Sequence, residues 1–137
     1  MKLLLRKKPA STVDVDGERD RRIAAGFDFQ GKRYQSRPDD RENIAGAAVA
    51  ALRAIGAGAS EGDYGWFKDV PIFCWIAENN DLTPMDAQTM FEFGEAAMAH
   101  KQSIIFFGRA LKDRIEEGTY VPDVTDDALW SQPEVQQ

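Results

Sequence analysis

The sequence predicts a helix-dominated α+β fold with two main packed helices, over about residues 37–56 and 84–117, a small hairpin and a short strand pair. Three observations predict it. Two long segments repeat apolar residues at helical spacing, and alternating aromatic residues flank a glycine turn. The chain has 137 residues, of which 43% are hydrophobic and 29% charged, which is typical of one globular domain.

The N-terminal segment is basic and extended in pattern. It begins with a short apolar run and a basic patch, and Val13-Asp14-Val15-Asp16 alternates further on. We therefore expect residues 1–17 to form an arm outside the core, followed by a globular domain over residues 18–118 and an acidic tail over 119–137. The residues of the arm that we expect to contact a partner are Leu3, Leu4, Leu5, Arg6, Lys7 and Lys8.

A short helix and a hairpin are predicted next. The helix covers about residues 18–25 and stops at Gly26, since glycine tolerates the left-handed conformation that ends helices. Phe27, Phe29 and Tyr34 then alternate around Gln30-Gly31, which is typical of a β-hairpin with its aromatic side chains on one face.

The first main helix has start and stop signals at both ends. Ser36 is a candidate cap, Pro38 suits the first turn, and Gly56 ends the helix. Apolar residues recur in steps of three and four, which predicts one buried face, and most of them are alanine, which lets a neighbouring helix approach closely: Ile44, Ala47, Ala48, Ala51, Leu52 and Ile55.

A short strand pair is predicted between the two main helices. Residues 73–77 are apolar on both faces, residues 78–81 have turn chemistry, and Leu82 follows in a return strand. Cys74 lies inside the apolar run, where we interpret it as a small packing residue.

The second main helix carries the most regular pattern in the chain. Thr83 and Pro84 are predicted to start it, and Gly94 and Gly108 lie where backbones could pack closely. Its apolar stripe repeats every seven residues: Met90, Phe93, Ala97, His100, Ile104, Phe107 and Leu111. Either this stripe packs on the first main helix within one chain, or part of it contacts a second chain. The extra apolar pair Ile105 and Phe106 favours a contact between chains.

Candidate sites of chemistry are scarce. One cysteine and one histidine are too few for a zinc site, and no nucleophile–base pair or phosphate-binding glycine motif is present. We interpret His100 as a hydrogen-bonded core residue, and the carboxylates of residues 39–42 as helix-start residues. The sequence thus predicts no enzyme activity, no catalytic residue, no metal and no cofactor.

Charge is distributed unevenly. Residues 1–41 hold eleven Lys and Arg against seven Asp and Glu, whereas the formal net charge of the chain is −6. No cation follows Glu116, and Trp130 is the one candidate anchor for a partner in the acidic tail.

Two classes of partner are disfavoured. The basic residues are few and mixed with acids, which disfavours binding to nucleic acid, and no apolar run is long enough for a membrane span.

Several stretches, taken together, resemble a phage domain-of-unknown-function family, number 4376. These are residues 19–35, 40–47, 75–80, 85–90, 99–101 and 109–113. The resemblance covers about residues 18–115 and implies an origin in tailed phages or prophages, near tail-fibre genes, without known catalytic residues.

This resemblance implies a structural component of a bacteriophage tail (fibre, tip or baseplate) that acts through protein–protein contacts. The protein would be made in the host cytoplasm and then join the virion. Its partners would be other tail proteins and further copies of itself, with host attachment as the process served. Two alternatives stay open: a tail-fibre assembly chaperone and, less favoured, a cell-wall-degrading enzyme.

Overall fold

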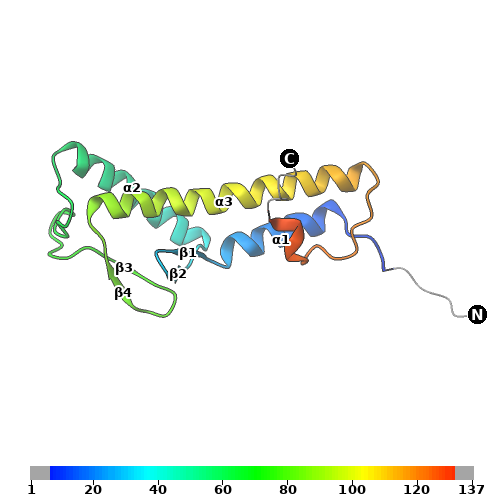
Figure 1. Cartoon of the computed structure of the whole chain (residues 1–137), viewed down its shortest axis with the longest axis horizontal. Helices are drawn as coiled ribbons and strands as arrows, with labels where there is room; N and C mark the ends of the chain where they lie inside the picture. The colour runs from blue at the N-terminus through cyan, green and yellow to red at the C-terminus, as the bar shows by residue number, and fades with distance from the viewer. Residues whose placement is uncertain (1–6, 132–137) are drawn as a thin grey trace, which may run out of the picture. The chain divides into compact units, whose positions relative to one another are not determined.

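Three α-helices and two antiparallel strand pairs build the fold in the computed structural model, which describes residues 7–131 (Figure 1). This confirms the prediction of a helix-dominated α+β fold. In chain order the elements are α1 (Thr12–Ala24), β1 (Phe27–Phe29), β2 (Lys32–Tyr34), α2 (Pro38–Gly56), β3 (Cys74–Ile76), β4 (Leu82–Pro84), α3 (Ala87–Glu116) and a 3₁₀ turn, η1 (Asp127–Trp130).

The chain separates into two compact units. Unit 1 combines residues 1–22 with residues 102–137, and unit 2 is residues 23–101. Helix α3 contributes its second half to unit 1 and its first half to unit 2.

An aromatic cluster around Phe93 of α3 forms the centre of unit 2. The ring of Phe93 lies 5.3 Å from that of Phe27 and 4.7 Å from that of Tyr34, and Phe29 completes the group at 5.2 Å. Phe27 and Tyr34 are paired across the β1–β2 hairpin, whose turn residues Gln30 and Gly31 have positive φ. The predicted hairpin and its aromatic face are therefore confirmed.

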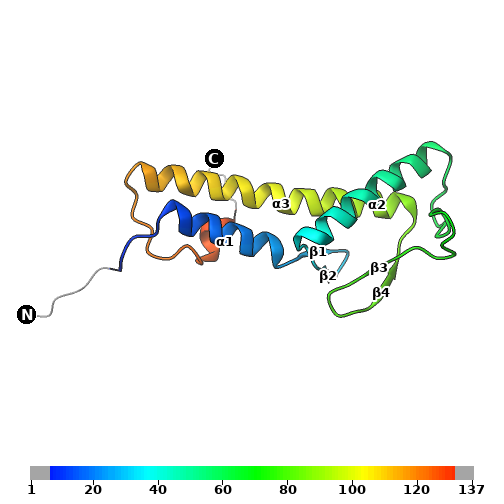
Figure 2. The ribbon, with the colours of Figure 1, turned by 180° about the vertical axis from the view of Figure 1, so that it is seen from behind.

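Helices α2 and α3 cross closely within unit 2 (Figures 1 and 2). A Cβ placed on Gly94 of α3 would lie 2.5 Å from the Cβ of Ala48 of α2, so the crossing requires a glycine there. Ile44 and Ala51 are buried on the inner side of α2.

The bounds of α2 agree with the predicted helix over 37–56, but the residue that caps its start differs from the predicted Ser36. The N–H of Arg37 donates to the Asp40 carboxylate at 3.0 Å, and Ser36 is buried before the helix.

The regular stripe of α3 packs within the chain. Five of its seven residues are buried and the other two half-buried: Met90, Phe93, Ala97, Ile104 and Leu111 are buried, and His100 and Phe107 half-buried. The predicted packing on the first main helix holds for Met90, Phe93 and Ala97, which share a core cluster with Ile44 and Ala51 of α2. Ile104 and Leu111 lie in unit 1, which does not contain α2. The predicted start of α3 was wrong, because Pro84 belongs to strand β4. Asp86 caps the helix instead, accepting the Thr89 N–H at 2.7 Å.

Helix α1 begins six residues earlier than predicted. Ser11 and Asp14 form a reciprocal cap, since each backbone N–H donates to the side chain of the other, at 2.8 and 3.3 Å. Val15 is fully buried, whereas Val13 is exposed. The interpretation of residues 12–17 as part of an extended arm was therefore wrong, since the alternation of Val and Asp belongs to a helix with one buried face.

Unit 1 packs α1, the second half of α3 and the C-terminal segment together. The Lys112 ammonium donates to the Asp16 carboxylate at 2.8 Å, which ties α3 to α1. The Ala10 N–H donates to the Val121 carbonyl at 2.8 Å. The buried apolar residues come from all three segments: Val15, Ile104, Leu111, Val121 and Trp130.

Candidate interaction surfaces

The N-terminal candidates fall partly outside the described residues. Leu3, Leu4, Leu5 and Arg6 all lie there, whereas Lys7 and Lys8 are described and exposed. The Tyr120 hydroxyl donates to the Lys7 carbonyl at 2.6 Å, so the described part of the segment lies against the chain's own C-terminal segment. Lys8 borders a groove of about 720 Å³ between the start of α1 and residues 122–124.

Trp130 belongs to the core of unit 1. Its side chain is only 7% exposed, and its Nε1–H donates to the Val124 carbonyl at 2.8 Å. The Arg22 guanidinium lies 5.3 Å from the indole centre, in a cation–π arrangement. The prediction of Trp130 as an anchor for a partner was therefore wrong, because the indole is buried and anchors the C-terminal segment to its own chain.

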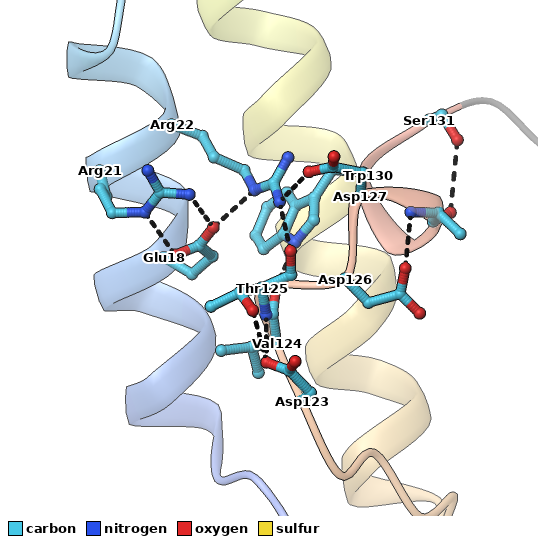
Figure 3. A network of polar contacts seen from close by, with 11 residues as sticks. Glu18, Arg21, Arg22, Asp123, Val124, Thr125, Asp126, Asp127, Trp130 and Ser131 are labelled. Atoms are coloured by element: carbon cyan, nitrogen blue, oxygen red, sulfur yellow. Dashed lines mark hydrogen bonds and ion pairs between the residues drawn. The ribbon is translucent and has the colours of Figure 1, made fainter.

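A polar network fixes that segment on α1 (Figure 3). Arg22 donates to the Thr125 carbonyl at 2.9 Å and to the Asp127 carboxylate at 2.7 Å. On its other side it donates to Glu18 at 2.7 Å. The tail acids are thus partly neutralised by an arginine of α1, since α1 supplies the cation that the sequence after Glu116 lacks.

Glu18 is the buried charge of this network. Arg21 donates to its carboxylate at 2.6 and 2.7 Å, and Arg22 adds a third bond. The hydrogen bonds from Arg21 lower the pKa of Glu18, burial opposes the shift, and Arg22 lowers the pKa further. Glu18 therefore stays ionised and holds two arginines in place.

Ile105 and Phe106 occupy different environments on α3. Phe106 is 68% exposed, whereas Ile105 is half-buried. Phe106 has polar or small neighbours along its own face, namely Gln102, Ser103 and Ala110, all of them exposed. It remains a candidate contact, but it is a single exposed ring and not part of a broad apolar area on α3.

A larger exposed apolar surface lies on the β3–β4 hairpin. Ile76 and Leu82 are directly opposite in the register, so they share one face of the ribbon. They are 56% and 65% exposed, and Ile72, just before the hairpin, is 60% exposed. We define the hairpin face as Ile72, Ile76 and Leu82. Sequence reasoning did not single out these residues, because a strand that is apolar on both faces is typical of a strand buried on both faces.

The opposite side of the hairpin is attached to the core of unit 2. Trp75 lies 5.6 Å from Phe93, and Thr83 accepts a hydrogen bond from the Tyr34 hydroxyl at 3.0 Å. At the base, the Trp66 indole N–H donates to the Met85 carbonyl at 2.9 Å. These contacts hold the hairpin in position and leave the hairpin face outward.

Asp86 fixes the loop that precedes the hairpin. Its carboxylate accepts the Gly62 N–H at 2.9 Å in addition to that of Thr89. Burial alone would raise the pKa of Asp86, but the hydrogen bonds from Gly62 and Thr89 outweigh it and lower the pKa. An ionised Asp86 thus connects the start of α3 to the loop over residues 59–71.

The remaining residues that the sequence analysis considered for chemistry, His100 and Cys74, are packing residues in the structure. The Nε2–H of His100 donates to the Ile23 carbonyl at 3.2 Å, and the ring stacks on Phe27, which confirms the interpretation as a hydrogen-bonded packing residue. Cys74 is half-buried in β3. Within residues 7–131, no three His, Cys, Asp or Glu side chains are grouped so as to hold a metal ion. None of the helices in that range has the length and apolar character needed to cross a membrane.

One family model matches most of the chain, including the stretches on which the family resemblance was based. The family described as "Domain of unknown function (DUF4376)" matches residues 6–129. The chain belongs to the DUF4376 family. The match is wider than the 18–115 expected and takes in all of α1, which agrees with the helix being part of the domain. No curated protein and no solved structure matches the chain.

Proposed function

We propose that this DUF4376 protein is a non-enzymatic structural component of a bacteriophage tail, at the fibre, tip or baseplate. It acts there through contacts with other tail proteins. The resemblance of residues 19–35 and 40–47 to the phage family supports an origin in tailed phages or prophages. The observation that carries a binding role is the hairpin face, because Ile76 and Leu82 are paired large aliphatic residues that are both exposed, and Ile72, two residues before the hairpin, is also exposed.

An exposed aliphatic face of this kind is suited to protein contact. Burying a Leu or Ile side chain contributes roughly 1.5–3 kcal/mol, so three such residues are an appreciable driving force for association. The face also lies on a ribbon of only two strands, and no third strand pairs with either of them within the described residues. Edges of this kind accept an additional strand from a partner. A tail protein that supplies an extended apolar segment would use both features.

The location is tested by mass spectrometry of purified virions of the phage that carries the gene. We expect the protein to be present in a fixed ratio to the other tail proteins after density-gradient purification. Peptidoglycan and host polysaccharide incubated with the protein should release no fragments above a blank. Turnover that Asp39→Asn or Glu42→Gln abolishes would contradict the non-enzymatic role.

A tail-fibre assembly chaperone is the second candidate. Such a protein would use the same hairpin face on a folding intermediate of the fibre and leave before the virion is complete. The protein would then be absent from purified virions, and particles from phage lacking the gene would have no fibres. Ile76→Lys with Leu82→Lys should impair either role, whereas Val13→Lys, at an exposed valine of α1, is a matched control.

A further inference from the structure

Helix α2 carries a second apolar stripe, about 100° around the helix from its buried residues Ile44 and Ala51. Ala45, Val49, Leu52 and Gly56 are spaced by four, three and four residues, so they share one line along the helix. All four are exposed, with Val49 at 61% and Leu52 at 53%. We define these residues as the outer stripe.

The sizes of these residues are complementary when the helix meets a second copy of itself in the antiparallel direction. About a two-fold axis level with the midpoint between Ala48 and Val49, Ala45 of one copy faces Leu52 of the other, so the largest side chain of the stripe lies over one of the smallest. The two Val49 side chains meet near the axis. A contact of this kind is isologous and closes at two copies.

The charges beside the outer stripe are complementary in the same arrangement. Glu42 and Arg53 are eleven residues apart, about three helical turns, so they lie on the same flank of the stripe. In an antiparallel pair related by a two-fold axis, equal flanks face each other. Glu42 of one copy therefore lies on the flank that faces Arg53 of the other, offset by about 3 Å along the helix, which these long side chains can span, and the symmetry makes this pair twice. Both residues are exposed, and no ion pair joins either one to another residue within 7–131.

We propose that the outer stripe of α2 is a self-association surface, which pairs with the same stripe of a second copy in an antiparallel helix dimer. The match of Ala45 with Leu52 and of Glu42 with Arg53 specifies both the partner and the direction. A parallel pair would instead turn this flank of one helix away from the same flank of the other, so Glu42 and Arg53 would not meet. The dimer does not depend on a location in a phage tail.

The central experiment exchanges charges. The molar mass of the full chain is measured by sedimentation velocity over a concentration series. Glu42→Arg and Arg53→Glu, each alone, replace two attractive contacts by two repulsive ones, because the symmetry doubles every substitution. Exposed ion pairs are weak individually, but each substitution changes two of them, so we expect each variant to dimerise about tenfold more weakly. An equimolar mixture of the two variants restores both attractive pairs. We therefore expect mixed dimers at the affinity of the parent chain.

Apolar variants and a control complete the test. Val49→Glu places two carboxylates beside the axis and should abolish the dimer, whereas Val13→Glu, at a valine 75% exposed on α1, should leave it unchanged. At a concentration where the parent chain is monomeric, circular dichroism should show the same helicity and melting temperature for all variants, because each site is exposed. The inference is overturned if the parent chain is monomeric throughout the series. It is equally overturned if the two charge variants fail to combine when mixed, or if the dimer survives Val49→Glu and is lost in Phe106→Asp.

Discussion

Gly94→Ala is the most direct test of the crossing between α2 and α3. The added Cβ would lie 2.5 Å from the Cβ of Ala48, and both atoms are attached to helix backbone, so neither can rotate away. The two helices must therefore separate. Overpacking of this kind costs about 1–3 kcal/mol, while alanine in place of glycine within a helix contributes roughly 1 kcal/mol. We expect a net loss of about 1 kcal/mol in the free energy of unfolding.

Two further variants make this prediction specific. A Cβ on Gly46 of α2 meets nothing within 4 Å, so Gly46→Ala should stabilise the protein by about 1 kcal/mol through helix propensity alone. Ala48→Gly combined with Gly94→Ala removes the opposing Cβ and should recover most of the loss from packing. Urea unfolding followed by circular dichroism measures all three variants. If Gly94→Ala stabilises the chain as much as Gly46→Ala does, the close crossing is wrong.

Three shorter predictions concern charge, capping and the exposed ring of α3. The pKa of Glu18 is lowered in the folded state, so the ionised carboxylate stabilises the fold above the ordinary value of 4.5, and this stabilisation is lost as pH falls through the folded-state pKa. Glu18→Gln should therefore flatten the dependence of the unfolding free energy on pH below 4.5. Asp86→Ala removes the cap of α3 and its bond to Gly62, and thermal unfolding should show a loss of about 0.5–2 kcal/mol. Phe106→Asp should keep the parent melting temperature, because the ring is 68% exposed. If the variant stays folded but has a lower mass by light scattering, Phe106 belongs to an interface between chains. If the variant unfolds, the exposed position of Phe106 is wrong.

Local signals were sufficient for much of unit 2. Alternating aromatic residues around Gln30-Gly31 predicted the β1–β2 hairpin, and the steps of three and four predicted α2 with its bounds. The glycine at position 94 was predicted to permit close packing, and Ala48 lies opposite it. These features depend on residues close together in sequence, so periodicity and turn chemistry specify them.

Unit 1 depends on contacts between distant parts of the chain, and sequence reasoning failed there. Asp14 is a helix-cap partner of Ser11, but in sequence the same residue looks like part of an alternating strand. Arg22 contacts Asp127 and Trp130, more than one hundred residues away. No local pattern contains such a pairing. A tail with acids and one tryptophan therefore resembled a free segment, although α1 supplies both the cation and the surface that it needs.

This difference changes what a truncation of the tail would mean. The sequence predicts that removing residues 119–137 leaves a folded core and only reduces assembly into particles. In the structure the same deletion removes Val121 and Trp130, both buried, and exposes the part of α3 around Gly108, which Trp130 covers. Truncating a buried tryptophan costs about 3–5 kcal/mol, a large part of the stability of a small domain.

We therefore expect the deletion of residues 119–137 to unfold unit 1, whether or not a partner is present. Hydrogen exchange should show protection lost in α1 and in the second half of α3, with the region around Phe93 still protected. Trp130→Ala should produce the same pattern in weaker form. Ala128→Gly, at an exposed position of the same segment, should change little. If the deletion keeps full protection in α1 and fails only to enter virions, the tail is a docking segment after all, and its packing on Arg22 is not what stabilises unit 1.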